Sequence, residues 1–131
     1  EMLKNVLAVI SGIVVSVFVV IGMDMLSHSF YGHADPEIIN TPQKFAEYVQ
    51  TLPIGAFIIL ILGHFLAALF GSIITLVLSS KNRLLIWFPV GILLLSVILN
   101  LALIPHPLWF MIADVIAPIL GGIICLRLVK R

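Results

Sequence analysis

Four ionisable side chains within otherwise apolar stretches are the residues of this sequence that could do chemistry. They are Asp24, His28, His64 and Asp114. A carboxylate at the centre of a membrane helix costs about 2.5–3.5 kcal/mol unless it is paired, protonated or hydrated. Because no lysine or arginine lies near either acid in the sequence, a histidine, water, a metal ion or a proton must neutralise it. The set therefore predicts proton exchange, ion binding or a structural ion pair.

Four apolar runs must position these side chains. They span residues 3–26, 53–79, 84–104 and 108–129, and each can cross a hydrocarbon core of roughly 30 Å at about 1.5 Å per residue. The chain is 62% hydrophobic and 10% charged, with a mean hydropathy of +1.26, which is far too apolar for a soluble domain. The sequence thus predicts an all-α membrane protein whose four transmembrane helices form one domain over residues 1–131.

The basic residues predict the orientation of these spans. All of them except Lys44 fall on one side of a four-span arrangement: Lys4, Lys81, Arg83, Arg127, Lys130 and Arg131. Since loops rich in lysine and arginine stay in the cytoplasm, we expect both termini to be cytoplasmic. The first run is too long for a signal-peptide core and lacks a small-residue cleavage site, so we expect it to be retained. Glu1 precedes Met2, and we expect it to be an added or renumbered residue.

The outer loop, residues 27–52, is the one sizeable polar segment. Thr41 is a candidate N-cap and Pro42 a candidate first helical residue. The apolar residues that follow at helical spacing are Phe45, Tyr48, Val49 and Leu52. This pattern predicts a short amphipathic helix over about 42–50, which lies along the outer interface or covers the mouth of the bundle. Asp35 before Pro36 predicts another brief turn.

Polar residues within the spans gather in the outer half of this arrangement. The predicted intramembrane polar cluster comprises Asp24, His28, His64, Asn100 and Asp114, with His106 at its outer mouth. Counted from the outer ends of the helices, Asp114 lies about two turns deep and His64 near the midplane. We expect Asp114 to face the interior, with His64 as its partner and Asn100 as a hydrogen-bonding neighbour. The cluster could line an outward-opening cavity.

Three roles compete for this cluster. In a small transporter or channel-like protein, Asp114 and His64 could exchange a proton or move ions, with Pro118 loosening the fourth helix. Alternatively, a divalent transition metal could bind Asp24, His28, His64 and Asp114, although no metal-binding motif strengthens this set. The third role is structural, as hydrogen-bonded core groups. We expect no enzyme, because the charged residues are too few to handle a lipid phosphate, and no cofactor other than that metal.

Small residues at four-residue spacing predict helix-packing surfaces on two spans. They are Gly63, Ala67 and Gly71 in the second span and Ala113, Ala117 and Gly121 in the fourth. Because four short spans are commonly one protomer of a larger assembly, we favour a helix-packing scaffold or membrane-complex subunit. Its expected partners are the lipid bilayer and either further copies of the chain or another membrane protein. The net charge of +1 gives no reason to expect nucleic acid.

The second and fourth spans also align with each other. A shift of fifty positions places GHFLAALFGSIITL on ADVIAPILGGIICL, with His64 opposite Asp114. A duplication would give two parallel helical hairpins related by an axis along the membrane normal. Chance similarity between apolar stretches is the alternative, and the first and third spans support the repeat poorly.

GHFLAALFGSIITL, PHPLWFMIAD and the Gly-Gly helix end together resemble small bacterial four-helix inner-membrane proteins of uncharacterised activity. The resemblance spans most of the chain and depends on a short His…Gly and Pro-x-Trp-Phe…Asp…Gly pattern. It implies a multi-pass protein of the bacterial inner membrane and attaches no activity. The sequence differs from small multidrug pumps, which carry a glutamate within the first span, and from small fluoride channels, whose glycine- and threonine-rich patterns are missing here.

Overall fold

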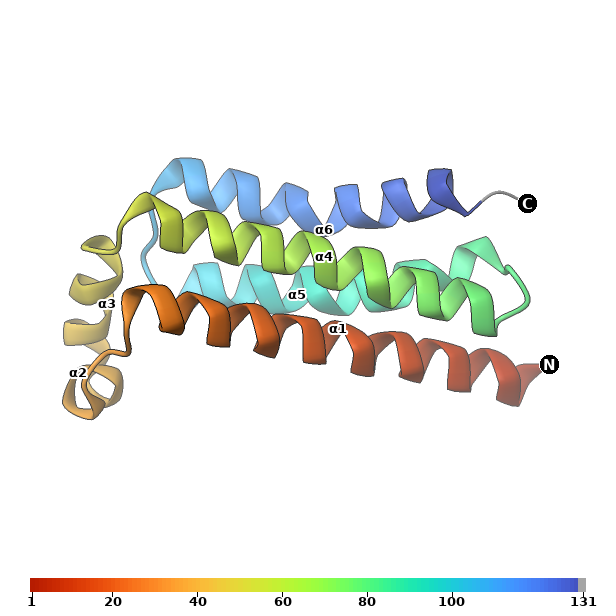
Figure 1. Cartoon of the computed structure of the whole chain (residues 1–131), viewed down its shortest axis with the longest axis horizontal. Coiled ribbons are helices and arrows are strands. Elements are labelled where there is room, and N and C mark those ends of the chain that lie inside the picture. Colours follow the sequence, from red (N-terminus) through yellow and green to blue (C-terminus); the bar gives the residue numbers. More distant parts are fainter. Residues whose placement is uncertain (130–131) are drawn as a thin grey trace.

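The computed structural model describes residues 1–129, and its regular structure is entirely helical (Figure 1). Its elements are α1 (Met2–Tyr31), α2 (Pro36–Asn40), α3 (Pro42–Gln50), α4 (Ile54–Leu78), the 3-10 turn η1 (Arg83–Ile86), α5 (Trp87–Leu103) and α6 (Leu108–Leu128). Within the described residues, α1, α4, η1 with α5, and α6 are each long and apolar enough to cross a membrane. The predicted all-α membrane protein with four spans is confirmed. Lys130 and Arg131 lie outside the described residues.

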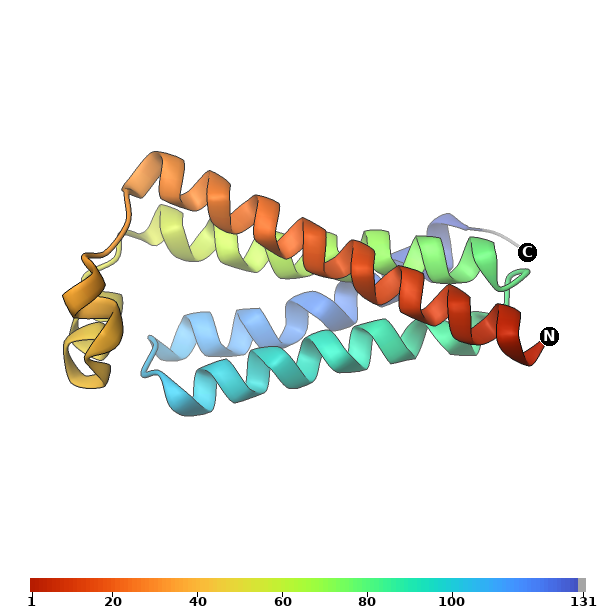
Figure 2. The same ribbon diagram turned by 90° about the horizontal axis from the view of Figure 1, so that it is seen from below.

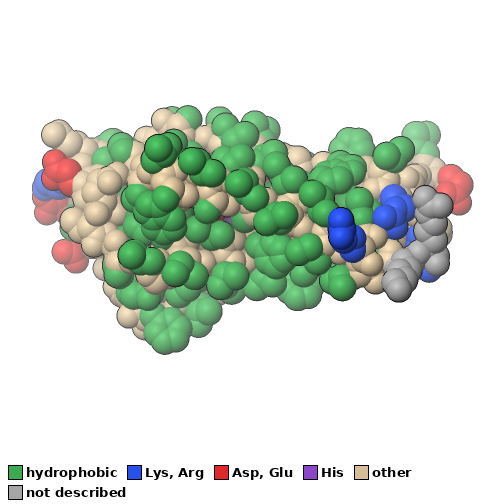
Figure 3. All heavy atoms as spheres, turned by 90° about the horizontal axis from the view of Figure 1, so that it is seen from above, with side chains coloured by type: hydrophobic (Ala, Val, Ile, Leu, Met, Phe, Trp, Pro, Cys, Tyr) green, Lys and Arg blue, Asp and Glu red, His purple; other side chains and the backbone are tan. Residues whose placement is uncertain are grey.

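The long helices run side by side, and α2 and α3 lie across one end of them (Figures 1 and 2). We call this the loop end. The opposite end is where α1 begins and α6 ends, and we call it the basic end. All described lysines and arginines except Lys44 lie there: Lys4, Lys81, Arg83 and Arg127. Figure 3 shows hydrophobic side chains covering the middle of one face and charged side chains at its two ends. This distribution is that of a multi-pass membrane protein, whose apolar middle meets lipid.

Prolines and one glycine set the helix ends nearest the loop end. Pro53 and Pro107 occupy the N-cap positions of α4 and α6, where a missing N–H costs no helical hydrogen bond. Hydropathy alone predicts that the first helix ends near residue 26, but α1 continues to Tyr31. Residues 27–31 contain no helix breaker, and the helix ends only at Gly32, whose φ of 78° suits a residue without a side chain.

α3 covers the mouth of the bundle, which is one of the two predicted placements. Val49 is buried in an apolar cluster with four residues of the long helices, and Phe45 and Leu52 pack against the same cluster. Thr41 stands at the N-cap of this helix, but its side chain makes no capping hydrogen bond, and the same holds for Asp35 at the N-cap of α2. A proline at the start of each helix fixes φ there without a side-chain cap.

α4 is the central helix, packed along both α1 and α6. A Cβ built on Gly71 would lie 2.0 Å from Ser16 Oγ and 2.7 Å from the Gly12 carbonyl oxygen of α1. On the other side, a Cβ on Gly121 of α6 would lie 2.6 Å from the Phe65 carbonyl oxygen. The backbones can approach this closely only because these positions lack side chains.

The predicted small residues therefore meet partners within the chain. Ala67 and Ala117 are buried, a Cβ on Gly63 would approach Met23 of α1, and Ala113 is half-buried. Ser16 Oγ also donates a hydrogen bond of 2.8 Å to the Ala67 carbonyl oxygen, which ties α1 to α4. By contrast, α1 and α5 touch each other little and diverge toward the loop end (Figure 2).

Candidate functional site

His64 of α4 and Asp114 of α6 form a hydrogen-bonded pair where the two helices meet. The distance from His64 Nδ1 to Asp114 Oδ1 is 2.5 Å. The side chain of Asp114 is completely buried, and that of His64 is 15% exposed. Electrostatic interactions are stronger in such a dry environment than in water, and an unpaired charge there is correspondingly costly. The two side chains therefore form a buried polar pair within the membrane-spanning part of the bundle.

α6 directs Asp114 inward and bends beside it. Asp114, Ala117, Pro118 and Gly121 are all buried, as expected for positions that share one helical face. Pro118 has no N–H to donate to the carbonyl group of Asp114, four residues earlier, and an interior proline bends a helix. α6 changes direction in its middle (Figures 1 and 2). The backbone carbonyl group of Asp114 therefore lacks the donor that a helix normally supplies four residues later.

Asp114 is held through only one of its carboxyl oxygens. Oδ1 meets His64, whereas Oδ2 is buried and has no hydrogen-bond partner among the described residues. A buried carboxylate needs partners for both oxygens to compensate for the loss of water. His64 is therefore the group on which the charge of Asp114 depends.

His64 also lines a cavity of about 200 Å³ between α1, α4 and α5, which we call the midplane cavity. Because Nδ1 is engaged by Asp114, Nε2 is the ring nitrogen left for this cavity. The other polar residues in its wall are Ser16, Ser96 and Asn100, and the rest of the wall is apolar. The pair thus has one buried member and one member that reaches an open space.

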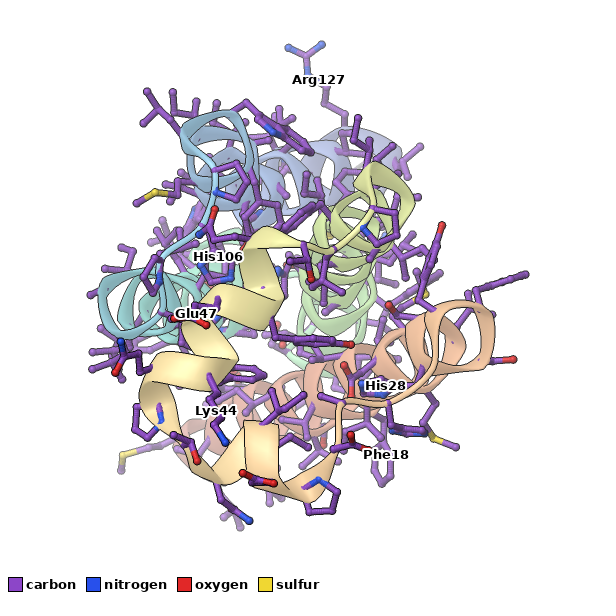
Figure 4. All side chains as sticks on the ribbon, turned by 90° about the vertical axis from the view of Figure 1, so that its left-hand side faces the viewer. Phe18, His28, Lys44, Glu47, His106 and Arg127 are labelled. Atoms are coloured by element: carbon purple, nitrogen blue, oxygen red, sulfur yellow. The ribbon has the colours of Figure 1, made fainter. Side chains whose placement is uncertain are left out.

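A second cavity, of about 380 Å³, lies under α3 at the loop end, and we call it the vestibule. Its polar lining includes Asp24, His28 and His106, together with Asn100, which also lines the midplane cavity. Asn100 is therefore a wall residue of both cavities, which lie next to each other. Figure 4 looks onto this end and shows α3 lying across the long helices, with His28 on α1 and His106 labelled.

One polar contact ties α3 to the bundle, and another joins α3 to α2. Gln50 Nε2 donates a hydrogen bond of 2.8 Å to the carbonyl oxygen of Pro105, in the connection between α5 and α6. Lys44 of α3 pairs with Glu37 of α2. The cover of the vestibule is thus attached to the far side of the bundle as well as to α1 and α4.

The structure brings the predicted polar cluster together only in part. His64 meets Asp114, and Asp24 Oδ2 lies 3.4 Å from His28 Nδ1, so four of the residues form two separate pairs. The expected hydrogen bond from Asn100 to Asp114 is not formed, since Oδ1 of Asp114 meets His64 and Oδ2 has no partner among the described residues. Asn100 lies instead in the walls of both cavities. Over residues 1–129, no three His, Cys, Asp or Glu side chains are placed to hold one metal ion. The four predicted metal ligands do not converge.

Sequence reasoning missed two features near these sites. His33 stacks on His28 with ring centroids 4.2 Å apart and lines the vestibule. The sequence signal that could have indicated this pair is that His33 follows His28 by five positions and comes directly after Gly32. A further cavity of about 490 Å³ lies between α1 and the start of α5 at the basic end, and buried Asn5 Oδ1 beside it has no hydrogen-bond partner among the described residues. Nothing in the apolar sequence of these helices indicates it.

Comparison with known proteins assigns no relative: no family model matches the chain, and neither curated proteins nor solved structures give a significant match.

Proposed function

We propose that this multi-pass membrane protein is a small proton-coupled transporter in which His64 and Asp114 take up and release a proton. One observation carries the proposal: the buried, hydrogen-bonded pair reaches a cavity that shares the wall residue Asn100 with the loop-end vestibule. Ionisable residues that face the interior of a membrane bundle commonly mark proton relays and substrate paths. Histidine is suited to this role because it can change charge near neutral pH.

The protonation steps follow from the chemistry of the two side chains. An ionised carboxylate can only accept hydrogen bonds, so with Asp114 charged the Nδ1–H of His64 donates and Nε2 has a free lone pair. A proton that arrives from the midplane cavity binds Nε2 and converts the imidazole to an imidazolium. The positive charge of the imidazolium offsets the negative charge of the Asp114 carboxylate, and the net charge of the pair rises from −1 to 0. Loss of the same proton restores the starting state.

Access to the pair supports uptake from the loop end. The vestibule and the midplane cavity adjoin, whereas toward the basic end α4 packs closely on α1 at Gly71 and on α6 at Gly121. Release to the other side would require α6 to move away from α4. Pro118 provides the flexible point for that movement, one turn after the acid.

The scaffold hypothesis loses its main support, since its basis was the small-residue surfaces. The small residues of these surfaces already pack against other helices of the same chain: Gly63, Ala67, Gly71, Ala117 and Gly121. These surfaces therefore need no partner protein or second copy to explain them. Transport rather than scaffolding is the function that we favour.

We further propose that both termini face the cytoplasm, in a bacterial inner membrane. The described basic residues other than Lys44 gather at the basic end, as the positive-inside rule requires of a cytoplasmic face. The bacterial location is what the resemblance to small four-helix membrane proteins implies. In this orientation the vestibule opens to the outside.

We expect Asp114→Asn to reduce proton entry into proteoliposomes to the rate of protein-free liposomes. Asparagine keeps the shape of the side chain but cannot offset the charge of a protonated His64. The measurement is the response of a trapped pH-sensitive dye to an imposed pH gradient, with the membrane potential clamped by potassium and valinomycin. Glu47→Gln on the exposed face of α3 is the control, and it should conduct like the wild type. Equal proton entry in wild type and Asp114→Asn would refute the proposal.

A further inference from the structure

We propose that the midplane cavity binds a membrane-soluble phenol or quinol, a hydroxylated ring on an apolar tail, which enters sideways from the bilayer between α1 and α5. This inference depends on the proposed function in one respect, because the same His64–Asp114 pair supplies the hydrogen-bond acceptor. It adds the class of molecule that the site takes and the path by which it arrives.

The entry path is a hollow seam between α1 and α5. The midplane cavity and the cavity at the basic end both lie along it, the first beside Ile13 and Pro89 and the second beside Ile10 and Phe88. The two cavities share no wall residue, so they are separate spaces along the same pair of helices. Wall residues of the midplane cavity also form part of the outer surface, since Val17 is 51% exposed and Ile92 is 48% exposed. On this side the midplane cavity borders the lipid-facing surface, whereas at Asn100 it borders the vestibule.

Apart from Asn100, whose amide can also donate, the polar groups in the wall of the midplane cavity are acceptors, so they favour a ligand that brings its own hydrogen-bond donor. Ser16 donates its hydroxyl hydrogen to the Ala67 carbonyl oxygen, and Ser96 donates its own to that of Ile92, so both hydroxyls have only lone pairs left. His64 Nε2 is likewise an acceptor when Nδ1–H donates to Asp114. The hydroxyl group of an apolar molecule can donate its one hydrogen to His64 Nε2. A phenolic hydroxyl, which ionises near pH 10, is an acidic donor well matched to a basic imidazole.

The size and charge of the cavity narrow the ligand further. A dry cavity of about 150 Å³ accommodates benzene, so a volume of about 200 Å³ suits one ring with small substituents. No lysine or arginine lines the cavity, which argues against a phosphate headgroup. The tail would extend along the seam, where Val9 and Val6 provide an apolar surface toward the basic end. A single hydroxylated ring on a hydrocarbon chain meets all these conditions.

The test uses para-octylphenol with a photoreactive diazirine in its tail, added to the full-length protein in liposomes. We expect the label, mapped by mass spectrometry, to concentrate in residues 6–21 of α1 and 85–97 of η1 and α5. Unlabelled para-octylphenol should displace it, whereas para-octylanisole, whose methyl ether cannot donate, should compete about tenfold less well, as loss of one hydrogen bond predicts. Octanol should also compete less well than the phenol.

Two tryptophan variants distinguish labelling in the midplane cavity from labelling of the general lipid-facing surface. Ile92→Trp fills the wall of the midplane cavity and should abolish displaceable labelling. Ile116→Trp, on the exposed side of α6 and outside the cavity lining, should leave it unchanged. Labelling spread evenly over all four spans, or equal competition by phenol and anisole, would overturn the proposal and indicate that lipid acyl chains fill the seam.

Proton flux in the same liposomes separates this inference from the proposed function. Flux that requires Asp114 without displaceable labelling would contradict only the ligand. Displaceable labelling with flux that does not depend on Asp114 would contradict only the transporter.

Discussion

The His64→Leu variant should lose about 3–5 kcal/mol of unfolding free energy, because it leaves the carboxyl group of Asp114 buried without its partner. The double variant His64→Leu/Asp114→Leu should recover most of that loss, since two apolar side chains then fill the same interface without a buried charge. The measurement is equilibrium unfolding in mixed micelles, followed by circular dichroism. His28→Leu is the matched control: its pair with Asp24 is partly exposed, and we expect a change within about 1 kcal/mol.

The double variant makes this prediction specific to the pair. If the effects of the two single leucine variants simply added in the double variant, His64 and Asp114 would not be coupled. A destabilisation of His64→Leu no larger than that of His28→Leu would likewise contradict the buried pair.

Gly71→Val is expected to destabilise the protein by about 1–3 kcal/mol or more, through overpacking between α1 and α4. The new Cβ would lie 2.0 Å from Ser16 Oγ and 2.7 Å from the Gly12 carbonyl oxygen, so the two helices must separate. That separation would also break the hydrogen bond from Ser16 to Ala67. The same unfolding experiment measures the effect.

Gly22→Val provides the control for this second prediction. Nothing lies within 4 Å of a Cβ built on Gly22, so valine there has the same β-branched side chain in a membrane helix without the clash. We expect its unfolding free energy to stay close to that of the wild type. Similar losses in the two valine variants would mean that α1 and α4 are not in close contact at Gly71.

The spans and the buried pair could be predicted from the sequence because each leaves a local signal. Long apolar runs predict helices in lipid, where the backbone must satisfy its own hydrogen bonds. Pro53 and Pro107 then locate two of the helix starts. Counting residues inward from those ends places Asp114 and His64 at compatible depths, and the structure joins them. Predicting where α1 ends would have required the backbone conformation of Gly32, which hydropathy does not reflect.

The polar cluster predicts an outward-opening cavity, but the positions and shapes of the cavities could not be predicted, because lipid-facing and protein-facing positions carry the same residue types in these helices. Val97 is buried and Ile92 is half-exposed, although both are aliphatic residues of α5. The hollow seam between α1 and α5 depends on how far these helices diverge, which is a property of the whole bundle. Asn100 illustrates the same limit: its depth suggests a partner for Asp114, but its direction on α5 takes it to the junction of two cavities.

Nitrogen NMR of the His64 ring in lipid nanodiscs tests most directly whether Asp114 holds Nδ1 and leaves Nε2 free for the cavity. The signals can be assigned by their loss in His64→Leu. We expect the neutral ring to carry its proton on Nδ1, and Nε2 to take up a proton as the pH falls. A neutral ring protonated on Nε2, unchanged by Asp114→Asn, would contradict the proposed proton site.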